Sequence, residues 1–198
     1  MTIERRALAA SPEVRADNGA KVARGYAALF NVETDIGGYF REIIAPGAFG
    51  DSLQNGDVRA LIDHDTGRVI GRSSAGTLRL QEDDKGLHVE IDLPDTTDGR
   101  DLAVQLERGD ISGMSFGFRV THDEWDETTE IPTRTIHSVE LFEVSAVAFP
   151  AYDDTEIALR SLDRAREEAQ AERAKKEHNQ AGYLKRKAEQ EQRVRGIR

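Results

Sequence analysis

Short apolar runs separated by turn residues recur through most of the chain, and this pattern restricts the fold more than any other feature. In residues 78–80 and 87–93, apolar and polar side chains alternate on either side of the turn-forming sequence at 83–86. Alternation with a period of two is typical of strands with one buried face, and the turn between them indicates a hairpin. Similar runs are found at residues 22–30, 39–44, 59–62, 69–71, 111–120 and 135–149. We therefore expect a mainly β protein in which antiparallel pairing dominates.

One helix is expected among these strands. Thr97 or Asp98 can cap the N-terminus of a helix over residues 99–108, because side chains of this type accept hydrogen bonds from the first free backbone N–H groups. Gly109 follows, and glycine commonly ends helices. The helix should lead the chain directly into the strand at residues 111–120.

Composition divides the chain into three segments. Residues 1–20 are polar and show no periodicity, which predicts a flexible N-terminal arm. Residues 21–157 contain the apolar runs and predict one folded domain, since a chain of this length can bury a sizeable core. Residues 158–198 are rich in Ala, Glu, Gln, Lys and Arg, which predicts a charged tail that is helical or partly disordered. An interaction or targeting role is the alternative interpretation of this tail.

The charge distribution argues against a nucleic-acid partner. The net charge is -10 at pH 7, and residues 1–160 contain 30 acidic side chains against 16 basic ones. This part of the chain should repel phosphate backbones. Residues 161–198 contain 11 basic and 7 acidic side chains, a mixture too even for a basic binding surface.

The sequence also limits the cellular setting. It contains no cysteine, which excludes disulfides, zinc–thiolate sites and a cysteine nucleophile, and a reducing cytoplasm fits best. No run of about 18 apolar residues is present to span a bilayer, and the N-terminus has no apolar signal segment. We therefore expect no membrane association.

Two side chains are candidates for chemistry, although each type is more often structural. Ser115 is a small polar residue among large apolar ones, in a sequence that begins at Gly113 and ends at Gly117. Glycines in a strand permit the close approach of another backbone. His64 lies between Asp63 and Asp65, so a metal-dependent hydrolase is one interpretation. In an extended segment, however, both aspartates would point away from the histidine.

A series of motifs resembles, in order, the signatures of the phage prohead serine protease family. The motifs are at residues 25–27, 44–49, 61–65, 70–71, 86–87, 109–118 and 141–151. The resemblance extends over residues 22–155 and depends on the combination of motifs. The family is similar in fold to herpesvirus assemblin, which implies an assemblin-like antiparallel β-barrel with peripheral helices.

The resemblance implies that Ser115 is the nucleophile and His64 its base. A serine hydroxyl becomes nucleophilic when a neutral imidazole takes its proton, and a third group should hold that imidazole. Glu143 is the first choice for this group because a carboxylate in so apolar a strand needs a partner. Glu140 is the second choice and His137 the third. Alternation should place the two glutamates on opposite faces, so that only one can serve.

The family also implies a function, which is that of a serine endopeptidase without a cofactor, acting inside the assembling procapsid in the host cytoplasm. Its substrates would be a separate scaffold protein or the scaffolding segment of the major capsid protein, and the chain itself. The portal protein and a second copy of the chain are further partners to consider. A catalytically idle internal scaffold protein of the same fold is the alternative, favoured by the composition of the tail. Backbone N–H groups of residues 68–74, or of the stretch after Pro150, are the candidate oxyanion donors.

Overall fold

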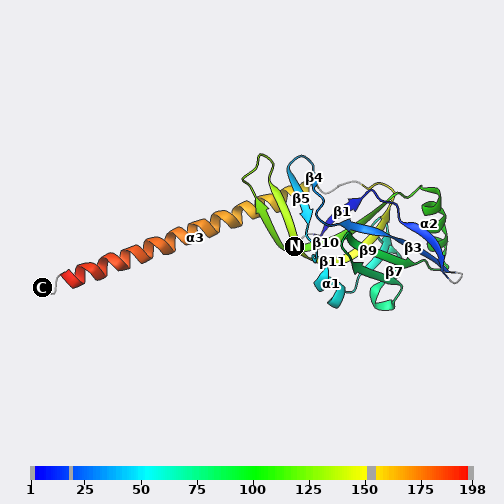
Figure 1. The fold of residues 1–198 in the computed structure, drawn as a ribbon, viewed down its shortest axis with the longest axis horizontal. Coiled ribbons are helices and arrows are strands. Elements are labelled where there is room, and N and C mark those ends of the chain that lie inside the picture. The colour runs from blue at the N-terminus through cyan, green and yellow to red at the C-terminus, as the bar shows by residue number, and fades with distance from the viewer. Residues whose placement is uncertain (1–2, 18–19, 151–154, 196–198) are drawn as a thin grey trace. The chain divides into compact units, whose positions relative to one another are not determined.

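The computed structural model describes residues 3–17, 20–150 and 155–195. It contains two compact units, Met1–Ile157 and Ala158–Arg198. Figure 1 shows that strands make up most of the first unit. The strands are β1 (Glu4–Leu8), β2 (Glu13–Asp17), β3 (Ala20–Leu29), β4 (Thr34–Ile36), β5 (Phe40–Ile44), β6 (Arg59–Ile62), β7 (Asp65–Arg72), β8 (Leu78–Glu82), β9 (Gly86–Asp92), β10 (Gly113–Asp126) and β11 (Thr133–Val147). The helices are α1 (Gly50–Asn55), the 3-10 turn η1 (Ser73–Ala75), α2 (Thr97–Arg108) and α3 (Thr155–Arg195).

The strands of the first unit form two sheets. The larger has seven strands in the order β1-β10-β11-β5-β4, with β6 pairing with both β11 and β7. The smaller has four strands in the order β2-β3-β9-β8. Most neighbours are antiparallel, but β11 pairs in parallel with both β5 and β6. The mainly β class is therefore confirmed, including the predicted β8–β9 hairpin.

The expected antiparallel β-barrel is not confirmed, because the sheets do not close within the described residues. Across the described part of the chain, the strand pairings do not return to their starting strand. β11 pairs in parallel with β5 near its start and with β6 near its end, so the sheet is not purely antiparallel. α1 connects β5 and β6, which do not pair with each other in the described part of the chain.

The core lies between strands of both sheets. Its buried apolar residues include Val89 and Ile91 of β9 as well as Phe116 and Phe118 of β10. The two phenylalanine rings stack with centroids 4.8 Å apart. Phe49 packs edge-on against Phe116 at 5.5 Å. Each such ring stabilises the fold by about 1.5–3 kcal/mol through burial.

The N-terminal segment differs from the flexible arm that its composition predicted. β1 pairs antiparallel with β10, and β2 pairs antiparallel with β3. Glu4 and Arg6 of β1 are buried despite their charges. Polar composition was misleading here because the strand buries charged side chains against charged partners, and not against apolar ones.

These partners form a buried charged cluster of Glu4, Arg6, Glu42, Asp123 and Arg134. Arg6 bonds Glu42 at 2.6 Å and Glu4 at 2.9 Å. Arg134, which is 0% exposed, bonds Glu4 at 2.9 Å, Glu42 at 3.2 Å and Asp123 at 2.7 Å. Burial alone would raise the pKa of Glu4, but the guanidinium groups of Arg134 and Arg6 lower that pKa below its usual value. Glu4 therefore remains ionised, and the cluster joins β1 to β5, β10 and β11.

The helix that the sequence predicts just before β10 is confirmed as α2. Thr96 caps it one residue earlier than expected, accepting a hydrogen bond from the backbone N–H of Gly99 at 3.3 Å. Gly109 ends it with φ of 78°, a left-handed conformation that glycine adopts without a steric penalty. The chain then enters β10, as the sequence predicts.

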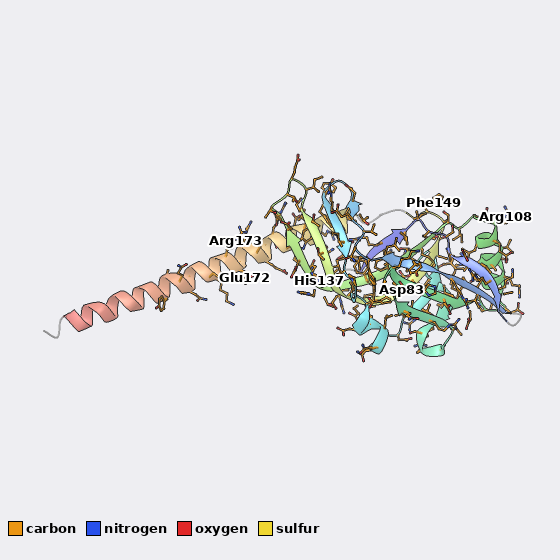
Figure 2. The ribbon with its side chains drawn as sticks, viewed as in Figure 1. Asp83, Arg108, His137, Phe149, Glu172 and Arg173 are labelled. Atoms are coloured by element: carbon orange, nitrogen blue, oxygen red, sulfur yellow. The ribbon has the colours of Figure 1, made fainter. Side chains whose placement is uncertain are left out.

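The second unit consists mainly of α3, a helix of 41 residues with a largely exposed surface. Ion pairs of the i,i+4 type stabilise it, with Lys176 3.3 Å from Glu172 and Arg164 3.8 Å from Glu168. Figure 2 shows Glu172 and its neighbour Arg173 projecting from this helix. No helix within the described ranges is both long and apolar enough to span a membrane.

Candidate active site

His64 lies in a tight turn between β6 and β7. Ile62 pairs with Asp65, so the turn consists of only Asp63 and His64. Their φ angles are 47° and 59°, and positive φ at both central residues is characteristic of the type I′ turns that close two-residue hairpins. His64 therefore does not lie in an extended segment, which was the condition for both aspartates to point away from it. Non-glycine residues with positive φ cluster at functional sites, where the surrounding structure holds the strained backbone.

The end of β11 holds this turn. The backbone N–H of Asp63 donates to the carbonyl of Ala146 at 3.0 Å, and the carboxylate of Asp63 accepts from the N–H of Ala148 at 3.1 Å. Ser145 Oγ accepts from the backbone N–H of His64 at 3.2 Å. Asp63 thus serves the turn. No group of three or more potential metal-binding side chains is found among the residues that the structure describes.

The imidazole of His64 is held by Glu143. Its Nδ1 lies 2.7 Å from Glu143 Oε1, and the other carboxylate oxygen accepts a hydrogen bond from Ser145 Oγ at 2.6 Å. Because a carboxylate accepts hydrogen bonds, Nδ1 must carry the proton, which leaves Nε2 with a lone pair. Ser145 therefore contacts both the side chain of Glu143 and the backbone of His64, and it fixes their relative positions.

Two glycines of β10 make room for this arrangement. A Cβ atom at Gly117 would lie 2.4 Å from Glu143 Oε1, the oxygen that contacts His64. A Cβ at Gly113 would lie 2.6 Å from the ring of Pro150. The close approach at these glycines is mainly by side chains and not, as predicted, by another backbone; Leu8 O, 3.0 Å from the Cβ position of Gly113, is the backbone atom nearest to either glycine. Gly117 in particular leaves room for the carboxylate of Glu143.

Ser115 lies at the centre of the same part of the sheet. It pairs with Ser145 of β11 on one side and with Ala7 of β1 on the other. The residue is only 1% exposed, and its hydroxyl donates to the backbone carbonyl of Arg6 at 2.9 Å. In this structure the hydroxyl is thus bonded to β1 and not to His64.

The other two candidates for the third group lie elsewhere. Glu140 forms an ion pair with Arg119, and its side chain is 44% exposed, against 12% for Glu143. A register shift of the β10–β11 pairing interrupts the alternation between the two glutamates, and both lie on the partly exposed face. The prediction that they face opposite ways is therefore wrong.

His137 lies far from the proposed nucleophile. It is eight residues before Ser145, which corresponds to about 26 Å along a strand. Its Nε2 lies 3.4 Å from Glu124. Figure 2 shows His137 well separated from Phe149, which follows the other end of β11. His137 therefore makes no contact with the His64 site.

Sequence reasoning did not identify the role of Ser145. The signal was present, because Ser145 lies two residues after Glu143 and a strand places such residues on one face. A serine buried next to a buried carboxylate on the same face is a natural hydrogen-bond donor to it. The stretch after Pro150, one of the two candidate sources of oxyanion donors, begins outside the described residues.

Comparison with known proteins identifies relatives of this chain. A model of the family described as caudovirus prohead serine protease matches residues 9–170. The prohead protease of Enterobacteria phage HK97 is 36% identical over 154 residues, covering 74% of this chain and 64% of that protein. The prohead protease of Escherichia phage T5 is 33% identical over 95 residues, covering 48% and 42%. The chain thus spans less than two thirds of the length of either relative.

A solved structure is similar in fold. The bacteriophage T4 capsid assembly protease superposes with a TM-score of 0.53 and covers 75% of this chain and 98% of its own. Sequence identity in this comparison is 12%, so the likeness concerns the fold alone. The overall fold is therefore shared with a protein that is very distant in sequence.

Proposed function

Since this chain belongs to the caudovirus prohead serine protease family, we propose that it is a serine endopeptidase with Ser115 as nucleophile, His64 as general base and Glu143 as the third group. The observation that carries the proposal is the 2.7 Å contact between His64 Nδ1 and Glu143 Oε1. It supports the tautomer that a general base requires, with the proton on Nδ1 and the lone pair on Nε2.

The proposed reaction is acyl transfer in two steps. Ser115 Oγ attacks the scissile carbonyl carbon while its proton moves to His64 Nε2. The carbon–nitrogen bond then breaks, and the imidazolium gives that proton to the leaving amine. Water hydrolyses the acyl-enzyme by the same route, with His64 again taking and returning a proton. Glu143 stabilises the imidazolium in both steps, and Ser145 orients Glu143.

The reaction requires one rearrangement of the hydroxyl. Ser115 Oγ now donates to the carbonyl of Arg6, and it must exchange this bond for one to His64 Nε2. A change of the side-chain rotamer of Ser115 moves the hydroxyl without moving β10. Backbone N–H groups of residues 68–74 or of the stretch after Pro150 are proposed to stabilise the oxyanion.

The names of the relatives, prohead protease and capsid assembly protease, support substrates among the proteins of capsid assembly. We assign to this chain the cleavage of a scaffold protein or of the scaffolding segment of the major capsid protein, and of itself. The site of action is the assembling procapsid in the host cytoplasm, where the portal protein and a second copy of the chain are further candidate partners. Residues 21–157 are proposed to carry the activity, and the tail at 158–198 to recruit the enzyme to the shell.

Co-expression with the major capsid protein of the same phage tests this function. We expect intact-mass measurement to show shortened capsid protein or shortened enzyme, and the new termini to identify the cleavage sites. Chelators should not change the result, because the proposed chemistry uses no metal. If both the capsid protein and the enzyme keep their full mass, the result would favour an idle scaffold protein. Inhibition of cleavage by a chelator would favour a metal-dependent hydrolase at Asp63, His64 and Asp65.

A further inference from the structure

The edge of β10 beside Ser115 is covered by a segment of the chain itself. β11 occupies one edge of β10, and β1 (Glu4–Leu8) occupies the other. We propose that this second edge is the docking site for an extended substrate strand, and that β1 fills it as a gate that substrate must displace. This inference rests on the proposed function and adds a substrate-binding surface and its control.

The position of β1 is incompatible with access to the nucleophile. Ala7 pairs directly with Ser115, and the neighbouring carbonyl of Arg6 accepts the Ser115 hydroxyl hydrogen bond. As a result Ser115 is 1% exposed. A peptide carbonyl cannot approach Oγ while β1 is in place, so the active enzyme requires β1 to move.

Removal of β1 would expose an edge suited to a peptide. Five residues of β1 pair in register with β10, from Glu4 opposite Phe118 to Leu8 opposite Met114. Without β1, this stretch of β10 presents a row of unpaired N–H and C=O groups next to the nucleophile. Extended peptides bind such edges by adding a strand, with affinity from the main chain and specificity from alternate side chains.

The buried charged cluster permits this exchange. Glu4 and Arg6 are bonded to each other at 2.9 Å, so these two buried charges leave together as a neutral pair. Arg134 retains Glu42 at 3.2 Å and Asp123 at 2.7 Å. Glu42 loses its 2.6 Å bond to Arg6, but each of these charges keeps an oppositely charged partner, and a buried charge without one would be the most costly outcome.

The same cluster predicts which peptides fit. The vacated position faces Glu42 and Arg134, which now bond a basic and an acidic side chain two residues apart on β1. The residue opposite Ser115 is the small Ala7. We therefore expect preferred substrate strands to carry an acidic and a basic residue at alternate positions, followed by a small residue.

A reversible disulfide clamp tests whether the gate must open. The chain has no cysteine, and Leu8 and Met114 are paired across β1 and β10. Cα atoms of such pairs lie about 4.5–5.5 Å apart, within the range that a disulfide spans. In Leu8→Cys/Met114→Cys we expect oxidation to lower the cleavage rate at least about 100-fold and reduction to restore it. The reduced protein is its own control for folding.

A matched clamp shows whether a cross-strand disulfide alone impairs the enzyme. Arg79 and Glu90 pair across β8 and β9 in the other sheet. We expect Arg79→Cys/Glu90→Cys to cleave equally well when oxidised and reduced. Equal activity of the oxidised and reduced Leu8→Cys/Met114→Cys protein would overturn the proposal that β1 must move before cleavage.

Amide hydrogen exchange of the unmodified chain tests the gate without using activity. We expect the β1 amides to exchange about 100-fold faster than buried amides of β11, because β1 opens while the rest of the sheet stays folded. Exchange of both strands at one common rate would show that β1 leaves only on global unfolding, and would refute the proposal. The unmodified chain could also show fast exchange of the β1 amides without cleaving any substrate. That result would contradict the proposed function but support the gate.

Discussion

The Ser115→Ala variant is expected to lose peptide cleavage by about a million-fold, which leaves no activity detectable above background. The alanine side chain retains the volume of Cβ but has no oxygen to attack the scissile carbonyl. Because the Ser115 hydroxyl bonds only a backbone carbonyl of β1, its loss should change the free energy of unfolding by about 1 kcal/mol. The measurement is the initial rate of cleavage of a peptide that carries the identified site, together with a thermal unfolding curve.

Ser112→Ala is the matched control for this variant. Ser112 lies three residues earlier, just before β10 begins at Gly113, and it has no assigned role in the reaction. We expect its cleavage rate to remain within a few-fold of the unmodified enzyme. Cleavage by the folded Ser115→Ala protein at the unmodified rate would exclude Ser115 as the nucleophile.

The Glu143→Gln variant is expected to lower kcat by about 10³- to 10⁴-fold. An amide has nearly the shape of the carboxylate, but its NH₂ group can donate to Nδ1 of His64 and favour the tautomer with the proton on Nε2. That tautomer cannot accept the proton of Ser115. The amide also cannot stabilise the imidazolium that forms in the reaction. Steady-state kinetics should show the loss in kcat with little change in KM.

Glu140→Gln discriminates between the two glutamates. Glu140 carries the same chemistry on the same strand, but it pairs with Arg119. We expect this variant to retain kcat within a few-fold and to lose at most about 1 kcal/mol of stability, as is usual for exposed ion pairs. The reverse order of effects would make Glu140 the third group and would remove Glu143 from the proposed mechanism.

Local features of the fold could be predicted from the sequence because they depend on neighbours in the chain. The alternation around residues 83–86 predicts the β8–β9 hairpin, and Gly109 predicts the end of α2. Pairing between distant strands has no such local signal. The parallel pairing of β11 with β5 and β6 is therefore absent from the sequence pattern, and a closed barrel was expected in its place.

Buried charge explains the error at the N-terminus. Glu4 and Arg6 look like solvent-exposed residues in a sequence, and only their contacts with Glu42 and Arg134 make β1 a buried strand. Those partners are 36 or more residues away. Composition alone cannot distinguish such a strand from a flexible arm.

The resemblance predicted members for the candidate site but not its geometry. Motif resemblance placed His64, Ser115 and Glu143 in one site, and the structure brings His64 and Glu143 into contact. The tight turn at Asp63 and His64 could not be foreseen, because non-glycine residues rarely adopt positive φ. The hydrogen bond from Ser115 to β1 could not be predicted either, because it depends on a strand that the sequence did not predict.

The most direct test of the central claim is covalent labelling with an organophosphonate ester that carries a good leaving group. Ser115 Oγ should displace the leaving group from phosphorus while His64 takes the hydroxyl proton. The account predicts one adduct per chain, mapped by peptide mass to Ser115 and absent from the His64→Ala variant. An adduct on another residue, or equal labelling of Ser115 without His64, would contradict it.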